Sequence, residues 1–593
     1  MSGNPEQTRG AKAAAATADY IDQRTGIGLA VKNFARKVFP DHWSFLLGEI
    51  ALYSFLVLVL TGIFLTFFFV PSMGQTVYEG PFAPMNGVEM SEAFASVLTI
   101  SFEVTGGLLI RQIHHWAALL FIAAIVTHML RVFFTGAFRK PREINWVVGF
   151  TLMLLGLAAG FSGYSLPDDV LSGNGLRIAD GVARSIPVVG SYASYLLFGG
   201  EFPGEAIIPR LYAVHILLVP GLILALVGLH LLLVVLHKHT HYAGPGRSDR
   251  NVVGQPLFPV YAAKAGGFFF IVFGVLALMG ATMTINPVWN YGPYDPSPVS
   301  AGAQPDWYML FLEGGLRLMP GQGTEWVIAG FTIPMNILVP GVLIPGLLFT
   351  VLGAYPFIEA WVTGDRREHH IAERPRNNPV RTGIGVATLT AFLVLVVAGS
   401  NDILATHFGL SINDITWVLR FAFLLAPPLA FWATKRICLG LQRKDRELVL
   451  HGHETGRIVR FASGEYIEVH RPLDEYERWV KVSYEPKRPV ALLPEHDERG
   501  VRRKGYRRDA LRARVSRFFF EDRVDPVTPA ELAAAQSHGE HDGLPAGHDG
   551  AAELASGGHG DEPVRGSGDR AQAVGARSDA DLGADRGAAE HQA

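Results

Sequence analysis

The chain has 593 residues, of which 49% are hydrophobic and only 18% charged, a balance that argues against a water-soluble enzyme. The net charge of −3 points to no class of partner, because it adds a basic set near the apolar blocks to a mixed tail, and no nucleic-acid partner is expected. The single cysteine, Cys438, excludes a disulfide framework and a CxxCH site for covalent haem on this chain.

Residues 1–44 are polar and lack the short apolar core and cleavage signature of a signal peptide. Eight apolar blocks follow, each about twenty residues long, the length at which a helix crosses about 30 Å of hydrocarbon. We therefore predict an all-α integral membrane protein with eight transmembrane helices, at about 46–70, 113–135, 146–166, 211–236, 265–286, 332–354, 383–400 and 415–434.

Beyond the eighth block the composition changes. Residues 437–523 are basic and mixed with short apolar pieces, and they predict a partly ordered extension. Residues 524–593 are rich in Ala, Gly, Asp, Glu and His without a period, which predicts a disordered tail. The histidines of this tail have no repeated ligand spacing, so we expect no metal site there.

Lysine and arginine are concentrated in alternate loops. Residues 1–44, 136–145, 237–264 and 355–383 carry three to six of them each, whereas the intervening loops carry none to three. The positive-inside rule then predicts that both termini, and with them the C-terminal extension, are cytoplasmic. The same rule puts three long loops outside, at 71–112, 167–210 and 287–331.

The second block carries histidines at a spacing that suits one helix face. His114 and His128 are 14 residues apart, which leaves them about 40° apart around a regular helix and about 21 Å apart along it. His115 falls about 140° away from His128 and is left without a role. Ionisable side chains within a membrane are costly and are candidates for function, although any one of them can be a core histidine bonded to a neighbouring helix.

The fourth block repeats this arrangement with His215 and His230, which are 15 residues apart, about 60° around the helix and about 22 Å along it. Both blocks run from outside to inside in the predicted topology, so His114 lies level with His215, and His128 with His230. Matched imidazoles facing across a bundle suit an iron at the centre of a flat macrocycle. Two bis-histidine haems, stacked across the membrane, are therefore predicted.

Two arginines and four glycines fit the same prediction. Arg111 precedes His114 by three residues and Arg131 follows His128 by three, so that each can pair with a haem propionate, the alternative being snorkelling at a helix end. Two pairs of glycines in the first and third blocks, each pair 14 residues apart, leave room for a flat ring or a close helix: Gly48, Gly62, Gly149 and Gly163.

With these residues the chain resembles cytochrome b of the cytochrome bc complexes, the quinol–cytochrome c oxidoreductases, over about residues 40–436. The motif "GYSLP" (163–167) matches the end of the family's third helix. The motif "PDWY" (305–308) stands in the third outer loop, where the family carries Pro-Glu-Trp-Tyr. The long N-terminus, the PDWY variant and the tail resemble the actinobacterial branch.

The resemblance implies that residues 45–240 form a four-helix bundle with two non-covalent haem b groups, and that residues 241–436 form a second membrane domain of four helices. It implies menaquinone as the quinone, and a bacterial plasma membrane as the location. Its implied partners are a Rieske iron–sulfur subunit, a c-type cytochrome subunit, a haem–copper oxidase in a supercomplex, a second copy of the chain and membrane lipid. Since no cysteine precedes Cys438, the extra covalent haem of chloroplast-type relatives should be absent.

In the PDWY motif the resemblance implies that Asp306 accepts a proton as quinol is oxidised, and that Tyr308 positions the quinol ring. Aspartate is one methylene shorter than the family's glutamate, which leaves open which atoms it reaches. Without the histidines, the motif would equally suit a helix start with aromatic anchors at the membrane interface.

For an inner quinone site the resemblance points to His237, seven residues after His230 on nearly the same helix face, with an interfacial histidine as the alternative. Lys238 and His239 are expected among the lipid headgroups. The acid that mitochondrial relatives carry at the start of the fifth helix is missing, since Ala265 stands there.

The predicted function is quinol oxidation at an outer site, with one electron passing to the iron–sulfur partner. The other electron passes through the two b haems to an inner quinone, coupled to proton translocation. Two alternatives remain: a two-haem membrane anchor that links quinone to a dehydrogenase without bifurcation, and a haem-free transporter whose histidines relay protons.

Overall fold

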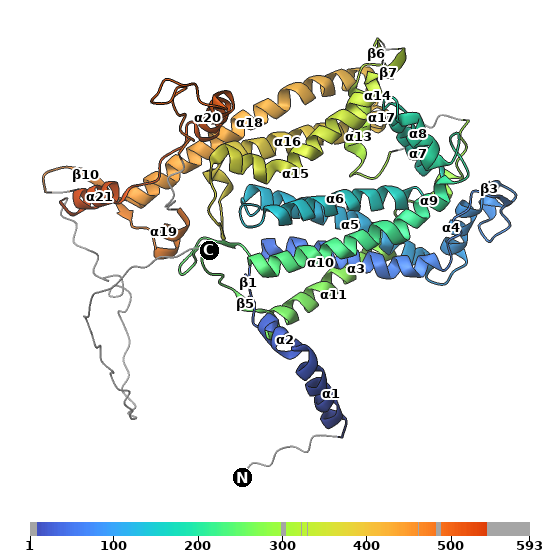
Figure 1. Cartoon of the computed structure of the whole chain (residues 1–593), viewed down its shortest axis with the longest axis horizontal. Helices are drawn as coiled ribbons and strands as arrows, with labels where there is room; N and C mark the ends of the chain where they lie inside the picture. The colour runs from blue at the N-terminus through green and yellow to red at the C-terminus, as the bar shows by residue number, and fades with distance from the viewer. Residues whose placement is uncertain are drawn as a thin grey trace, which may run out of the picture. The chain divides into compact units, whose positions relative to one another are not determined.

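The computed structural model describes residues 9–297, 304–321, 323–328, 330–460, 462–481 and 488–541. Within these residues eight helices are long and apolar enough to cross a membrane, which confirms the predicted fold class (Figure 1). They are α3 (Leu46–Thr66, preceded by the 3-10 turn η1, Trp43–Phe45), α5 (Gly107–Phe134), α6 (Glu143–Tyr164), α9–η3–α10 (Ile207–Ala213, Val214–Leu218, Val219–His237), η4–α11 (Leu257–Tyr261, Ala262–Thr282), α14–η5–α15 (Met335–Leu338, Val339–Leu343, Ile344–Thr363), α16 (Pro379–Gly399) and α18 (Ile412–His451).

The shorter elements lie before, between and after these spans. The remaining helices are α1 (Arg9–Thr25), α2 (Ile27–Ala35), η2 (Ala83–Met85), α4 (Glu92–Phe102), α7 (Val170–Arg184), α8 (Gly190–Phe198), α12 (Val288–Tyr291), α13 (Leu310–Leu318), η6 (Pro375–Asn377), α17 (Asn401–Phe408), α19 (Glu475–Lys481), α20 (Tyr506–Phe520) and α21 (Pro529–His541). The strands form two-stranded pairs, β1 with β5 (Val38–Phe39, Gln255–Pro256), β2 with β3 (Gln75–Val77, Glu89–Ser91), parallel β4 with β8 (His241–Tyr242, Ile371–Ala372), β6 with β7 (Glu325–Ile328, Phe331–Pro334) and β9 with β10 (His453–Arg460, Tyr466–Arg471).

The first four spans form one bundle, in which α3 packs along α5 and α6 packs along both α5 and α10 (Figure 1). Halfway along it lies an apolar layer of buried side chains from all four helices, including Phe55, Phe121, Leu152 and Ile223. The rings of Phe55 and Phe121 pack with their centroids 5.8 Å apart. This layer divides the interior of the bundle into two levels, one towards His114 and one towards His128.

The fourth span is not a regular α-helix. Residues Val214–Leu218 form a π turn, η3, and Pro220 stands in the first turn of α10. Proline lacks an N–H, and its ring crowds the carbonyl four residues earlier, so a wider turn before it relieves that conflict. A π bulge takes one extra residue. The spacing of 15 between His215 and His230 therefore acts as the 14 that separates His114 from His128.

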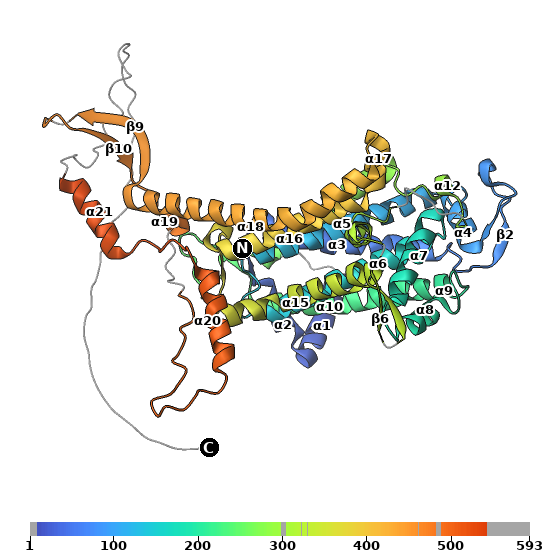
Figure 2. The same ribbon diagram turned by 90° about the horizontal axis from the view of Figure 1, so that it is seen from above.

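In the second group, the last four spans, α16 lies against α18 and α13 (Figure 2), whereas α11 packs on α3 and α5, and α15 packs on α6. The contact between α13 and α16 depends on Gly314, because a Cβ there would overlap the carbonyl oxygen of Leu395. Since α13 follows the PDWY motif directly, this close approach holds the motif at the His114 end of the bundle.

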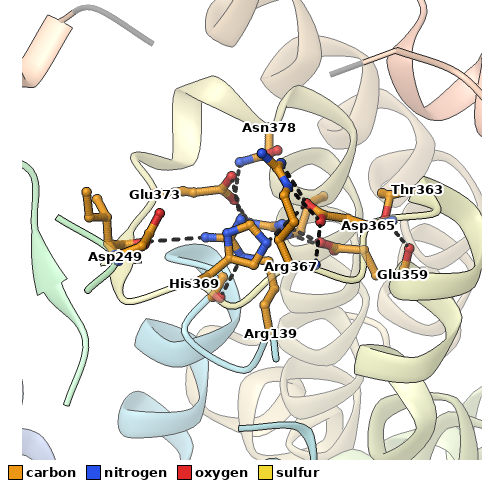
Figure 3. Close-up of polar contacts among 12 residues, drawn as sticks. Arg139, Asp249, Glu359, Thr363, Asp365, Arg367, His369, Glu373 and Asn378 are labelled. Carbon is orange, nitrogen blue, oxygen red and sulfur yellow. Dashed lines mark hydrogen bonds and ion pairs between the residues drawn. The ribbon is translucent and has the colours of Figure 1, made fainter. Parts of the chain in front are cut away.

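At the His128 end, the two groups of helices are joined by buried ion pairs (Figure 3). Arg381 of α16, whose side chain is 1% exposed, pairs with Glu359 of α15 and, at 2.7 Å, with Glu373. Glu373 also pairs at 2.9 Å with Arg139, which follows α5, and accepts a hydrogen bond from Asn378 at 2.6 Å. Every charge in the cluster has an opposite partner, as burial in an apolar setting requires.

The C-terminal part departs from the sequence prediction in one place. The described residues up to 533 belong to one compact unit, and a second begins at residue 534. Helix α21 begins at Pro529, inside the range expected to be disordered from residue 524 onwards. Thr528 explains its start, because its hydroxyl accepts from the Glu531 N–H while the Glu531 carboxylate accepts from the Thr528 N–H, a reciprocal capping box. Residues 542–593 of the predicted tail lie outside the described residues.

The ion-pair cluster predicts a stability effect. Glu359→Ala should lower the free energy of unfolding by about 3–5 kcal/mol, because it leaves the buried Arg381 guanidinium short of a partner. The thermal midpoint, followed by circular dichroism on the purified protein, measures the effect. Arg367→Ala is the matched control, since its pair with Asp365 is 58% exposed on the arginine side and should change stability by less than about 1 kcal/mol. Equal midpoints for the two variants would contradict the assigned role of the cluster.

Candidate functional site

The four membrane histidines lie in two facing pairs. The imidazole centroids of His114 and His215 are 6.2 Å apart, and those of His128 and His230 are 6.4 Å apart. Two metal–nitrogen bonds of about 2 Å, with about 1 Å from each nitrogen to its ring centre, span a similar length of about 6 Å. Each pair is therefore spaced to bind one metal ion between its rings.

In the outer pair, the second ring nitrogen of each histidine is hydrogen-bonded. His215 Nδ1 lies 3.0 Å from the carbonyl oxygen of Ala159, which can only accept, so Nδ1 carries the proton and Nε2 keeps a free lone pair. His114 Nδ1 lies 2.9 Å from the Thr61 hydroxyl, which already donates to the Val57 carbonyl and so accepts from the ring. These contacts orient both imidazoles with Nε2 available as a ligand.

Each of the four predicted glycines faces one of the four histidines. A Cβ at Gly62 would lie 3.2 Å from Cε1 of His114, and one at Gly163 would overlap the ring of His215. At the other level, a Cβ at Gly48 would lie 3.3 Å from Cε1 of His128 and one at Gly149 would lie 3.4 Å from Cε1 of His230. The glycines thus allow each imidazole to lie close against the neighbouring helix.

Two cavities contain these residues. A cavity of about 280 Å³ is lined by His114, His215 and Arg111 together with the glycines of that level. A second cavity, of about 410 Å³, lies at the other level and is lined by His128, His230 and Arg131, again with their glycines. We call them the outer haem cavity and the inner cavity. All ten residues that the sequence assigned to the haems line one or the other.

Both arginines carry buried donors without an acceptor among the described residues. Arg111 donates from both terminal nitrogens to the carbonyl oxygen of Asn286 at 3.1 Å, but its Nε has no partner. Arg131 lies over the ring of Phe45 at 4.1 Å, and its Nε and one terminal nitrogen have no partner. An unsatisfied buried donor on a cation is costly, and a carboxylate beside it would remove that cost.

These features fit a haem at each level. The described residues contain no cluster of three or more His, Cys, Asp or Glu side chains that could hold a metal by themselves. Each histidine pair supplies two ligands, so a macrocycle has to supply the rest. The two cavities leave room for a flat ring between the paired imidazoles, and the unsatisfied arginine donors suit its propionates.

The PDWY motif lies beside the outer haem cavity. The Tyr308 hydroxyl donates to Asp306 Oδ2 at 3.0 Å, and the phenol is buried at 3% exposure. Burial, and then the neighbouring Asp306, raise the pKa of Tyr308 well above its ordinary value, so its proton stays on the oxygen. A Cβ at Gly160 of α6 would overlap the Tyr308 hydroxyl, so this glycine makes room for the tyrosine.

His115, which the helical spacing left without a role, contacts the same carboxylate. Its Nε2 lies 3.3 Å from Asp306 Oδ1, so both oxygens of Asp306 have a partner. The two residues are 191 positions apart in the chain, so no sequence pattern within one helix or loop could predict their contact. Sequence reasoning therefore missed it.

A third cavity, of about 330 Å³, opens on the far side of Asp306 and Tyr308, between α7 and α13. Its lining is largely apolar and includes Ile178, Val182 and Leu316. Asp306 and Tyr308 line both this cavity and the outer haem cavity, so they form part of the wall between the two. We call it the outer quinol cavity.

A further carboxylate in this cavity, that of Glu313, was not singled out by the sequence. Glu313 pairs with Arg317 one turn further along α13, yet its second oxygen is buried without a partner among the described residues. Burial raises the pKa of Glu313, and Arg317 opposes that shift.

At the other end, His239 and not His237 lines the inner cavity. The His237 backbone carbonyl accepts a hydrogen bond from Arg142, and the residue is not among those lining the inner cavity. His239, expected among headgroups, lines the cavity and packs on Phe39 with ring centroids 4.7 Å apart. Burial, with Arg142 and Arg131, lowers the pKa of His239 to about 4, so its ring is neutral near pH 7. Lys238 also lines this cavity.

The chain is similar to a protein-family model and to named bacterial proteins. A family model described as "Cytochrome b(N-terminal)/b6/petB" matches residues 119–293. A protein of Streptomyces coelicolor named "Cytochrome bc1 complex cytochrome b subunit" is 54% identical over 542 residues, covering 91% of this chain and 99% of its own length. The protein of the same name from Mycobacterium tuberculosis is 52% identical over 472 residues, 79% of this chain and 85% of that protein.

A solved structure titled "Hyperthermophilic respiratory Complex III" shares the fold. It superposes with a TM-score of 0.53 at 22% sequence identity, covering 70% of this chain and 99% of that one. At this level of identity the likeness concerns the fold alone.

The paired histidines predict a specific loss. His128→Leu should remove the haem of the inner level and leave the outer one, because leucine offers no lone pair to iron. Haem per polypeptide, from the reduced-minus-oxidised spectrum and a pyridine extract, should fall to about half. His237→Leu is the control and should retain both haems. Full haem content with an unaltered spectrum in His128→Leu would rule out the assigned ligand.

Proposed function

This chain belongs to the family of cytochrome b subunits of cytochrome bc1 complexes, and we propose that it oxidises quinol in the outer quinol cavity and reduces quinone in the inner cavity. The observation that carries the proposal is the position of Asp306 and Tyr308 in the wall between the outer quinol cavity and the outer haem cavity. A molecule in the first cavity contacts the same carboxylate that borders the second.

Two haem b groups would be held by His114 with His215 and by His128 with His230. When bound, they supply one-electron transfer across the membrane between the two quinone-binding cavities. Arg111 and Arg131 would bind their propionates, since both arginines keep buried donors without an acceptor among the described residues. Neutralising these carboxylates in an apolar interior stabilises the bound state.

In the outer quinol cavity, Asp306 accepts a proton from the quinol hydroxyl. Tyr308 and His115 each contact one oxygen of Asp306. These two contacts keep the carboxylate in the wall of the outer quinol cavity, where it can accept the proton. The apolar lining from α7 and α13 suits a prenylated ring and limits the access of water. Quinol gives up two electrons here, one to an iron–sulfur partner and one to this chain.

Further features of the proposal follow from the family and the sequence. The positive-inside pattern supports a cytoplasmic position for both termini, so quinol oxidation releases protons outside and quinone reduction takes them up inside. We propose menaquinone as the quinone, a bacterial plasma membrane as the location, and assembly as a dimer. The proposed partners are a Rieske iron–sulfur subunit, a c-type cytochrome and a haem–copper oxidase.

The two alternative functions explain less of the molecule. A two-haem anchor without bifurcation accounts for the histidine pairs but gives no reason for a second cavity beside Asp306. A haem-free transporter leaves unexplained why each imidazole pair is spaced for one metal ion. It also conflicts with membership of a haem-binding family.

Asp306→Asn tests the outer site. The amide cannot take up a proton, so quinol–cytochrome c activity of the purified complex should fall by about 100-fold while both haems remain. Asp306→Glu should keep much of the activity, because it restores a carboxylate. Asp295→Asn, at an exposed position in the same loop, is the matched control and should turn over normally. Unchanged turnover in Asp306→Asn would remove this residue from the mechanism.

A further inference from the structure

The inner cavity holds one carboxylate among its described lining residues, that of Glu49. Glu49 lies in α3, directly after Gly48, which faces the ring of His128. Besides His128 and His230, the side chains on the lining that carry or can carry a positive charge are Arg131, Arg142, Lys238 and His239. Glu49 is partly buried, so its carboxylate needs hydrogen-bond partners in place of the water it has lost.

The two oxygens of Glu49 accept hydrogen bonds from two tyrosines. Tyr261, in η4 at the start of the fifth span, donates to Oε1, and Tyr53, one turn along α3, donates to Oε2 at 3.2 Å. No lysine or arginine of the described residues is paired with Glu49, whereas Glu359 and Glu373 at the same end are paired with arginines. Held by hydroxyls alone, Glu49 can lose and regain a proton without breaking a salt bridge.

The hydrogen-bond partner Tyr261 connects Glu49 to the wall of the cavity and to the exposed start of the fifth span. Tyr261 packs on Phe39 with ring centroids 4.8 Å apart, and Phe39 packs on His239, so the three rings form one wall of the cavity. One turn beyond Tyr261, Lys264 pairs with Asp41 at 2.5 Å, and both side chains are about half exposed. Ala265, which also lines the cavity, contributes no titratable group. Glu49 is therefore the one carboxylate on the described lining of this cavity, and its partner Tyr261 lies one turn from an exposed ion pair.

We propose that Glu49 donates one of the two protons that a quinone takes up in the inner cavity, with the Tyr261 hydroxyl holding its carboxyl in place. The inference rests on the proposed function of that cavity. Reduction of one quinone consumes two electrons and two protons and converts two carbonyls to two hydroxyls. The electrons come from quinol oxidised at the outer quinol cavity over two turnovers.

Each of the two protons that the quinone takes up has a source. One proton passes from the Glu49 carboxyl to a quinone oxygen, and the carboxylate left behind recovers a proton from water on the Lys264 side. The second proton comes from the same aqueous side. Arg142 and Lys238 raise the electrostatic potential of the cavity, which favours negative charge on the quinone oxygens before they are protonated.

Glu49→Gln tests the proposal in the complete purified complex, because glutamine keeps the shape and can still accept a tyrosine hydrogen bond. With menaquinol supplied, haem content and the first reduction of the haems should match the unmodified protein. Reoxidation of the inner haem by quinone should slow by about 100-fold, and proton uptake on the cytoplasmic side should slow with it. Glu49→Asp should recover part of the rate.

Two further variants keep the test decisive. Glu143→Gln changes a carboxyl at the same end of the bundle that does not line the inner cavity, and it should behave as the unmodified protein. Tyr261→Phe leaves Glu49 in place without one hydrogen bond, and it should slow inner-haem reoxidation about threefold to tenfold. If Glu49→Gln fails to assemble, Tyr261→Phe decides the matter.

The results distinguish the proposed role of Glu49 from the proposed function of the inner cavity. Normal reoxidation in both Glu49→Gln and Tyr261→Phe would overturn the assignment of Glu49 and leave the proposed function standing. If the unmodified complex itself shows no quinone-dependent reoxidation of its inner haem, the proposed function of the cavity fails instead.

Discussion

The structure depends on two pairs of imidazoles facing each other across the first bundle, with centroids 6.2 Å and 6.4 Å apart. Each imidazole also has to lie close against a neighbouring helix, α3 or α6. Glycine meets that need at four positions, each directly opposite one histidine. The π turn at His215 completes the arrangement, because its extra residue brings a spacing of 15 into line with the 14 on α5.

Between the two levels lies the apolar layer around Phe55 and Phe121, and at the His128 end lies the ion-pair cluster around Arg381. They solve different problems. The layer is non-directional and separates the outer haem cavity from the inner one. The cluster is directional and joins the loop after α5 to α15 and α16, so the second group of helices stays in register with the bundle. That register carries α13, and hence Asp306, to the outer haem cavity.

The two proposed quinone sites use the same combination of groups at opposite ends of the bundle. In each, a carboxylate lies at a largely apolar cavity and accepts a hydrogen bond from tyrosine: Asp306 from Tyr308, and Glu49 from Tyr261 and Tyr53. A hydroxyl partner orients a carboxylate without fixing its charge, which a guanidinium would do. Glu359 and Glu373, by contrast, pair with Arg381, which keeps them ionised. These pairs stabilise the fold and take no part in the proposed proton transfer.

The sequence alone was enough to predict the eight spans, the pairing of histidines by level and the arginines and glycines near them. These features follow from periodicity within single helices, where length, burial and angular position are set by a rise of about 1.5 Å and about 100° per residue.

Only the tertiary structure decided which partners meet across helices. His115 reaches Asp306 across 191 positions, and Tyr261 reaches Glu49 across 212. His239, two residues past the end of α10, lines the inner cavity, whereas His237, the last residue of α10, does not. Contacts of this kind depend on how separate helices and loops pack, and periodicity within one helix carries no information about that packing.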